Sequence, residues 1–148
     1  MQLDTAANTA TAPQSQSDAL LLLAKARNDA FAEASQGRLG RGISLLHDAL
    51  RDEPMSHDLA SDMAALLLSA REFESAILYA RRALAIAPRH GASLYSLGFA
   101  QAGLGHTADA IATMQRLIAG PERDSLMQEA PDLLPLVRFE LSRLQSLI

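Results

Sequence analysis

The sequence predicts an all-α fold made of repeated helix pairs, and three observations support this prediction. Ala (28 residues) and Leu (26 residues), which are both strong helix formers, make up over a third of the 148 residues. No stretch shows the run of alternating β-branched and aromatic residues that a sheet requires. Gly and Pro, which end helices, recur along the chain at regular intervals.

Residues 1–17 are predicted to form a flexible tail. They are mainly Thr, Ala, Gln, Ser and Asn, and so few large apolar side chains cannot offset the entropy lost on ordering. The segment also lacks the basic and apolar regions of a signal peptide. Ser17 and Asp18 are typical helix-capping residues, so we expect a single folded domain to begin there and to span residues 18–148.

A 34-residue period runs through the rest of the chain. Pro54 and Pro88 are separated by this interval. The same interval aligns three isoleucines, which are Ile43, Ile77 and Ile111. It also keeps one position small in three successive copies, at Ala30, Ala64 and Gly98. A helical bundle without repeats would explain the content of Ala and Leu but not this recurrence.

The second copy carries the clearest pattern. Ala64 and Ala76 are small, Leu67 and Ala80 follow at fixed spacing, and Pro88 ends the unit. This spacing resembles the tetratricopeptide repeat, a 34-residue helix-turn-helix unit, although Leu67 and Ala80 stand where that family has large aromatic residues. In the third copy the corresponding residues are Leu94, Leu97, Gly98, Gln101, Ala110 and Met114.

The resemblance covers about residues 21–122. It implies a right-handed α-solenoid of three helix-turn-helix units, at about residues 21–56, 57–90 and 91–124, in which each unit stacks on its neighbours. Only the second half of the first unit matches well, and in the third unit Pro121 arrives one residue early.

A C-terminal capping helix is predicted at about residues 131–148, because the last unit of such a stack would otherwise leave an apolar face bare. Its expected buried stripe consists of Leu133, Leu136 or Val137, Leu141, Leu144, and Leu147 or Ile148. The surplus of leucine leaves a second interpretation open, in which this helix forms a homodimer surface.

In the resembled family the first helices of successive units line a concave groove that holds a peptide or a helix of another protein. Carried over to this chain, the resemblance places the following residues in the groove: Arg27, Asn28, Phe31, Asp58, Ser61, Asp62, Ala65, Leu68, Tyr95, Ser96 and Phe99. Phe31, Tyr95 and Phe99 are three of the six aromatic residues of the chain, and aromatic side chains are frequent anchors at binding sites. Ordinary core packing is the alternative interpretation of these three residues.

One variant of the family clamps the terminal carboxylate of a heat-shock chaperone with Lys, Asn and Arg side chains. Of the residues at those places in this chain, only Arg27 could serve as such a donor, and Asp62 would repel a carboxylate. The sequence therefore disfavours this ligand. Asp58 and Asp62 suit a basic or amphipathic segment better.

Composition argues against several other functions. The formal net charge of -4 disfavours nucleic acid, and without cysteine there is no thiolate ligand or nucleophile. The four histidines, at positions 47, 57, 90 and 106, form no i, i+4 pair, so we expect no metal site and interpret His57 and His90 as exposed junction residues. No phosphate-binding loop or hydrolase motif occurs, so we predict no catalytic residues and no cofactor. The apolar run at residues 20–24 is too short to cross a membrane.

The sequence thus predicts a small cytoplasmic bacterial adaptor, not an enzyme, that binds a peptide or helical segment of a partner protein in its groove. Two alternatives remain open at this stage. One is a chaperone like those of type III secretion systems. The other is a dimerising structural or regulatory subunit of an envelope, pilus or secretion assembly.

Overall fold

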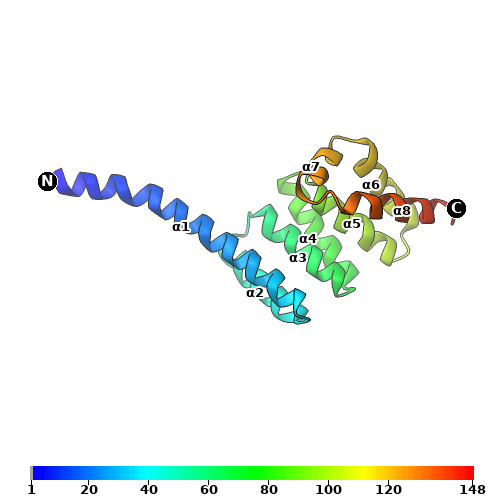
Figure 1. Cartoon of the computed structure of the whole chain (residues 1–148), viewed down its shortest axis with the longest axis horizontal. Coiled ribbons are helices and arrows are strands. Elements are labelled where there is room, and N and C mark those ends of the chain that lie inside the picture. The colour runs from blue at the N-terminus through cyan, green and yellow to red at the C-terminus, as the bar shows by residue number, and fades with distance from the viewer. Residues whose placement is uncertain (1) are drawn as a thin grey trace. The chain divides into compact units, whose positions relative to one another are not determined.

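The computed structural model describes the backbone of residues 2–148 and the side chains of residues 17–148. This part of the chain contains helices and no strand (Figure 1). The helices are α1 (Gln2–Ser35), α2 (Leu39–Asp52), α3 (His57–Ser69), α4 (Phe73–Ile86), α5 (Gly91–Gly103), α6 (Thr107–Ala119), α7 (Glu122–Glu129) and α8 (Leu133–Gln145). None of the helices described is both long enough and apolar enough to span a bilayer.

The helices follow the predicted 34-residue period. The second helices of the pairs begin at Leu39, Phe73 and Thr107, and the first helices α3 and α5 begin at His57 and Gly91. Both series advance by 34 residues, and the two helices of each repeat are joined by a turn of the same design.

These turns contain a left-handed residue at equivalent positions, which are Gly37 (φ 81°), Arg71 (φ 61°) and Gly105 (φ 77°). In each turn the next N–H donates to the carbonyl five residues earlier, as from Glu72 to Leu67 and from His106 to Gln101. This hydrogen bond is that of a Schellman motif, which satisfies carbonyls at the helix end and favours glycine. Arg71 adopts the conformation without glycine's freedom, and its guanidinium lies 5.2 Å from the ring centre of Phe73.

The chain divides into two compact units, Met1–Ala49 and Leu50–Ile148. The first contains α1 and most of α2. Glu33 forms an ion pair with Arg38 across the turn between the two helices, and Arg41 Nε lies 3.8 Å from the same carboxylate.

Helix α1 begins at Gln2, well upstream of Ser17 and Asp18, where we expected the first helix to start. Alanine recurs throughout the segment, and its strong helix propensity explains why the helix continues through these polar residues. Met1 and the side chains of residues 2–16 lie outside the described part of the chain, so the flexible tail predicted for residues 1–17 stays a prediction. The single domain over residues 18–148 also stays a prediction.

In the second compact unit, Leu50–Ile148, α5 is the central helix. It contacts α3, α4, α6 and α7. Its core joins buried residues of the repeat helices to those of the last two helices. Fully buried members include Leu94 of α5, Met114 and Leu117 of α6, Leu126 of α7 and Val137 of α8. The core is therefore continuous through the stack of helices.

The capping helix predicted at about residues 131–148 is present as α8, but the sequence predicted no second helix before it. Two helices follow α6: the eight-residue α7 contacts α5 and α6, and α8 contacts α6. Pro131 explains the break between them, because the residue before a proline is driven out of the helical conformation and Ala130 accordingly has φ -151°.

The buried stripe of α8 also differs from the prediction. It consists of Leu134, Val137, Leu141 and Leu144, which recur at intervals of three or four residues. Leu136, Leu147 and Ile148 are exposed instead. Phe139, which is 72% exposed, lies on the same helix and adds to this exposed apolar surface. The predicted homodimer through α8 stays a prediction.

Glu122, at the start of α7, is nearly buried and accepts a hydrogen bond of 2.8 Å from Arg116 Nη2. This bond lowers the pKa of Glu122 below its ordinary value, against the opposing effect of burial. The unfolded chain therefore takes up a proton here at higher pH than the folded chain, so folded stability is lost as pH falls through the lowered pKa. We expect the unfolding free energy of Glu122→Gln to fall less than that of wild type when the pH is lowered from about 7 to about 3, as measured by urea unfolding. An unchanged pH dependence would contradict this role.

Candidate functional site

Helix α5 carries a stacked aromatic pair. Tyr95 and Phe99 are one turn apart, their ring centres are 4.4 Å apart and their planes are inclined by 30°. Both side chains are half-buried and pack against the core, so each has a fixed base and an accessible portion. Rigid, partly exposed aromatic groups supply large contact area at low entropic cost, which suits a binding site.

Glu140 on α8 lies close enough to Tyr95 to affect the ionisation of its phenol. Burial raises the pKa of Tyr95, and the negative charge of Glu140 on α8 raises it further, so the phenol stays protonated and can donate a hydrogen bond. Arg143 donates to both carboxylate oxygens of Glu140, over 2.9 and 2.6 Å.

Helix α3 contacts α5 and carries five of the predicted groove residues, while Ser96, like Tyr95 and Phe99, lies on α5. Asp58, Ala65 and Leu68 are half-buried, as are Tyr95 and Phe99. Ser61, Asp62 and Ser96 are buried, with 2–7% exposure. The partly accessible members of the predicted groove therefore combine one carboxylate with apolar and aromatic groups.

The remaining predicted groove residues lie on α1, in the compact unit Met1–Ala49. Arg27 is half-buried, while Asn28 and Phe31 are exposed. Their participation in the same groove stays a prediction.

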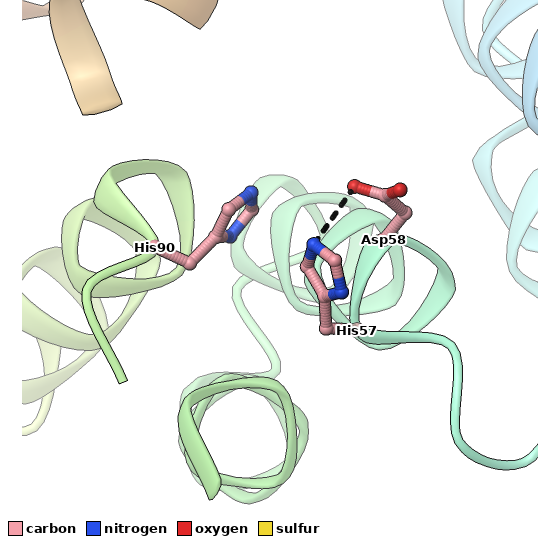
Figure 2. A group of neighbouring side chains, drawn as sticks. All are labelled: His57, Asp58 and His90. Atoms are coloured by element: carbon pink, nitrogen blue, oxygen red, sulfur yellow. Dashed lines mark ion pairs between the residues drawn. The ribbon is translucent and has the colours of Figure 1, made fainter. Parts of the chain in front are cut away.

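The prediction that His57 and His90 are separate, exposed junction residues is wrong. Their rings meet edge to face with centres 5.1 Å apart, and His90 is only 8% exposed. His57 is the first residue of α3 and His90 immediately precedes α5, so the repeat brings the starts of two adjacent helices together (Figure 2). The 33-residue separation, close to one repeat length, is the signal that could have indicated this contact.

Asp58 completes this cluster. Its Oδ1 lies 3.5 Å from His57 Nε2, and the three residues each offer a ligand atom within 4.8 Å of the others. His90 makes two further contacts: Nδ1 lies 2.7 Å from Ser93 Oγ, and Nε2 lies 3.1 Å from Glu129 Oε1 of α7. Two imidazoles and a carboxylate are groups that bind transition-metal ions.

Comparison with known proteins identifies the fold. The chain resembles the second tetratricopeptide-repeat domain of human RPAP3, which was solved in complex with an HSP70 peptide. The two share 16% sequence identity with a TM-score of 0.65, and the match covers 81% of this chain and 92% of that one. The TPR2B domain of yeast Sti1, in a complex with pHsp70, gives 15% identity, a TM-score of 0.67, and coverage of 80% and 94%. The TPR domain of Arabidopsis OM64 gives 16% identity, a TM-score of 0.67, and coverage of 83% and 93%.

No family model matches the sequence, and a search of curated proteins gives no match either. At these low identities the structural likeness establishes the fold. The helical-repeat solenoid predicted from the 34-residue period is thereby confirmed.

Proposed function

We propose that this chain, which has the tetratricopeptide-repeat fold, is an adaptor that binds a peptide or helical segment of a partner protein against α3 and α5. The observation that carries the proposal is the stacked pair Tyr95 and Phe99, which lies on α5 at positions that the repeat register assigns to the groove. The structural neighbours support it, because RPAP3 and Sti1 domains of the same fold were solved with chaperone peptides.

The proposed partner segment differs in chemistry from the HSP70 peptide of the RPAP3 complex, SGPTIEEVD, which carries two glutamates and an aspartate. The predicted groove residues include two carboxylates, Asp58 and Asp62, and one positive charge, Arg27, so the set as a whole is acidic. A segment with apolar side chains for Tyr95 and Phe99, and with basic rather than acidic side chains beside them, fits this set better. We therefore propose an amphipathic, basic partner segment.

Peptides selected from a random display library against the purified chain test this proposal. Wild-type protein is expected to select peptides that combine apolar and basic residues. The double variant Tyr95→Ala/Phe99→Ala is expected to bind them at least about tenfold more weakly, because truncated aromatic anchors are the costliest losses at an interface.

Phe139→Ala is the matched control, since it removes an exposed aromatic side chain from α8. This variant is expected to keep wild-type affinity. Circular dichroism and unfolding midpoints establish that each variant is folded at the assay temperature. Equal affinity of the double variant and wild type, or the absence of any selected peptide, would contradict the proposed site.

A further inference from the structure

We propose that His57, Asp58 and His90 form a binding site for a divalent transition-metal ion, with Zn²⁺ as the representative ion. The three residues come from the starts of α3 and α5 and face a common space (Figure 2). Imidazole nitrogen and carboxylate oxygen are established zinc ligands, and two imidazoles favour such an ion over Mg²⁺ or Ca²⁺.

The spacing of the ligand atoms is close to what such an ion requires. Zinc–ligand distances of about 2.0–2.2 Å in a tetrahedron place neighbouring ligand atoms roughly 3.3–3.6 Å apart. His57 Nε2 and Asp58 Oδ1 already have this separation, at 3.5 Å, and all three ligand atoms lie within 4.8 Å of one another. The His57 and Asp58 side chains are 37% and 33% exposed, so there is room for the small rotations that would close the remaining gap.

His90 is held as a metal-binding histidine would be. Its ring is buried, and Nδ1 lies 2.7 Å from the hydroxyl of Ser93, which is itself fully buried. The 3.1 Å contact with Glu129 places a proton on Nε2, because a carboxylate oxygen only accepts. A bound ion would replace this proton, and Nδ1–H would then donate to Ser93 Oγ. Glu129 Oε1, 3.1 Å from Nε2, is then in place to supply a fourth ligand.

The charge around the cluster favours a cation over an anion. The N-termini of α3 and α5 point toward it, and each amounts to about half a positive charge. Carboxylate oxygens are the charged groups nearest the imidazoles: Asp58 Oδ1 lies 3.5 Å from His57 Nε2, and Glu129 Oε1 lies 3.1 Å from His90 Nε2. These oxygens can bind a cation directly and would repel a phosphate or a peptide carboxylate.

An ion can reach the site from solvent. The side chains of His57 and Asp58 are partly exposed, and His90 lines a separate surface pocket with Ala87, Pro88, Arg89 and Ser125. A bound ion would connect the starts of α3 and α5, and through Glu129 the end of α7. An ion that binds the folded chain but not the unfolded chain stabilises the folded state by mass action. Zn²⁺ is therefore expected to raise the unfolding temperature.

The test is titration of the full chain with Zn²⁺ by calorimetry, together with the visible absorption spectrum of the Co²⁺ complex. Wild type is expected to bind one ion and to give the intense spectrum of tetrahedral Co²⁺. His57→Ala and Asp58→Asn remove partly exposed ligands, and each is expected to weaken Zn²⁺ binding at least about tenfold. Ser93→Ala, which removes only the support of His90, is expected to weaken it by about tenfold to a hundredfold.

His106→Ala is the control for adventitious binding, because His106 is an exposed histidine outside the cluster. It is expected to bind Zn²⁺ as tightly as wild type. The Tyr95→Ala/Phe99→Ala variant should also keep its zinc affinity, which separates this proposal from the proposed peptide groove. The absence of zinc binding by wild type, or equal affinity of wild type and His57→Ala, would overturn the proposal.

Discussion

Gly91→Ala is expected to destabilise the folded chain by about 1–3 kcal/mol, the usual cost of forcing extra atoms into a well-packed core. A Cβ at Gly91 would lie 2.5 Å from the backbone nitrogen of Leu126 and 2.9 Å from its Cα. Backbone atoms cannot rotate away as a side chain can, so α7 would have to move. That movement would strain the 2.9 Å hydrogen bond from Gly91 N–H to Ser125 Oγ and would begin to expose Leu126, which is fully buried.

Urea unfolding of Gly91→Ala beside Gly98→Ala measures this effect. At Gly98 the nearest atom to an added Cβ is Cγ of Met114, at 3.3 Å, and the flexible Met114 side chain can yield. We expect Gly98→Ala to unfold near the wild-type midpoint and Gly91→Ala well below it. Equal midpoints for the two variants would show that α7 is not seated against α5 as described.

Leu94→Ala is expected to cost about 2–5 kcal/mol of folding free energy, because it removes a large buried side chain and leaves a cavity. Leu94 has no exposed surface and lies on α5, the central helix of the second unit. The core cluster that contains it extends into α4, α6, α7 and α8, so the loss is expected to affect the whole unit cooperatively.

Leu78→Ala makes the same chemical change at a surface position, since Leu78 on α4 is 66% exposed. We expect its unfolding free energy to stay within about 0.5 kcal/mol of wild type. Thermal or urea unfolding of the two variants provides the comparison. A Leu94→Ala protein as stable as Leu78→Ala would disprove the assigned core.

The regular part of the fold could be predicted because it rests on spacing. Recurrence of Ile43, Ile77 and Ile111 reveals a repeated unit, and the helices and turns repeat at the same 34-residue interval. The turn at Arg71 could not be recognised from residue type, because arginine gives no signal for a left-handed conformation that Gly37 and Gly105 adopt without strain.

The end of the stack was harder to predict for a physical reason. Helix α7 has eight mostly polar residues, and among its large apolar residues only Leu126 is buried, so its sequence carries no helical stripe. It is held by tertiary contacts, including the close approach to Gly91 and the Arg116–Glu122 ion pair. On α8 the leucine surplus allowed two stripes, and packing against α6 selects the one containing Val137.

Of the candidate sites, the aromatic pair was predicted and the histidine cluster was missed. The resemblance placed Tyr95 and Phe99 on one face of a helix, where an i, i+4 pair must meet. His57 and His90 come together only through the stacking of two units, which a search for ligands within one helix does not detect.

Backbone NMR of the isotope-labelled chain, titrated with the tightest library-selected peptide, tests most directly whether the repeat groove is the binding surface. We expect amide shift changes to concentrate on α3 and α5, around Asp58, Tyr95 and Phe99, and to be small on the exposed face of α8 that carries Phe139. Shift changes confined to α8, with α3 and α5 unaffected at saturating peptide, would contradict the proposed groove.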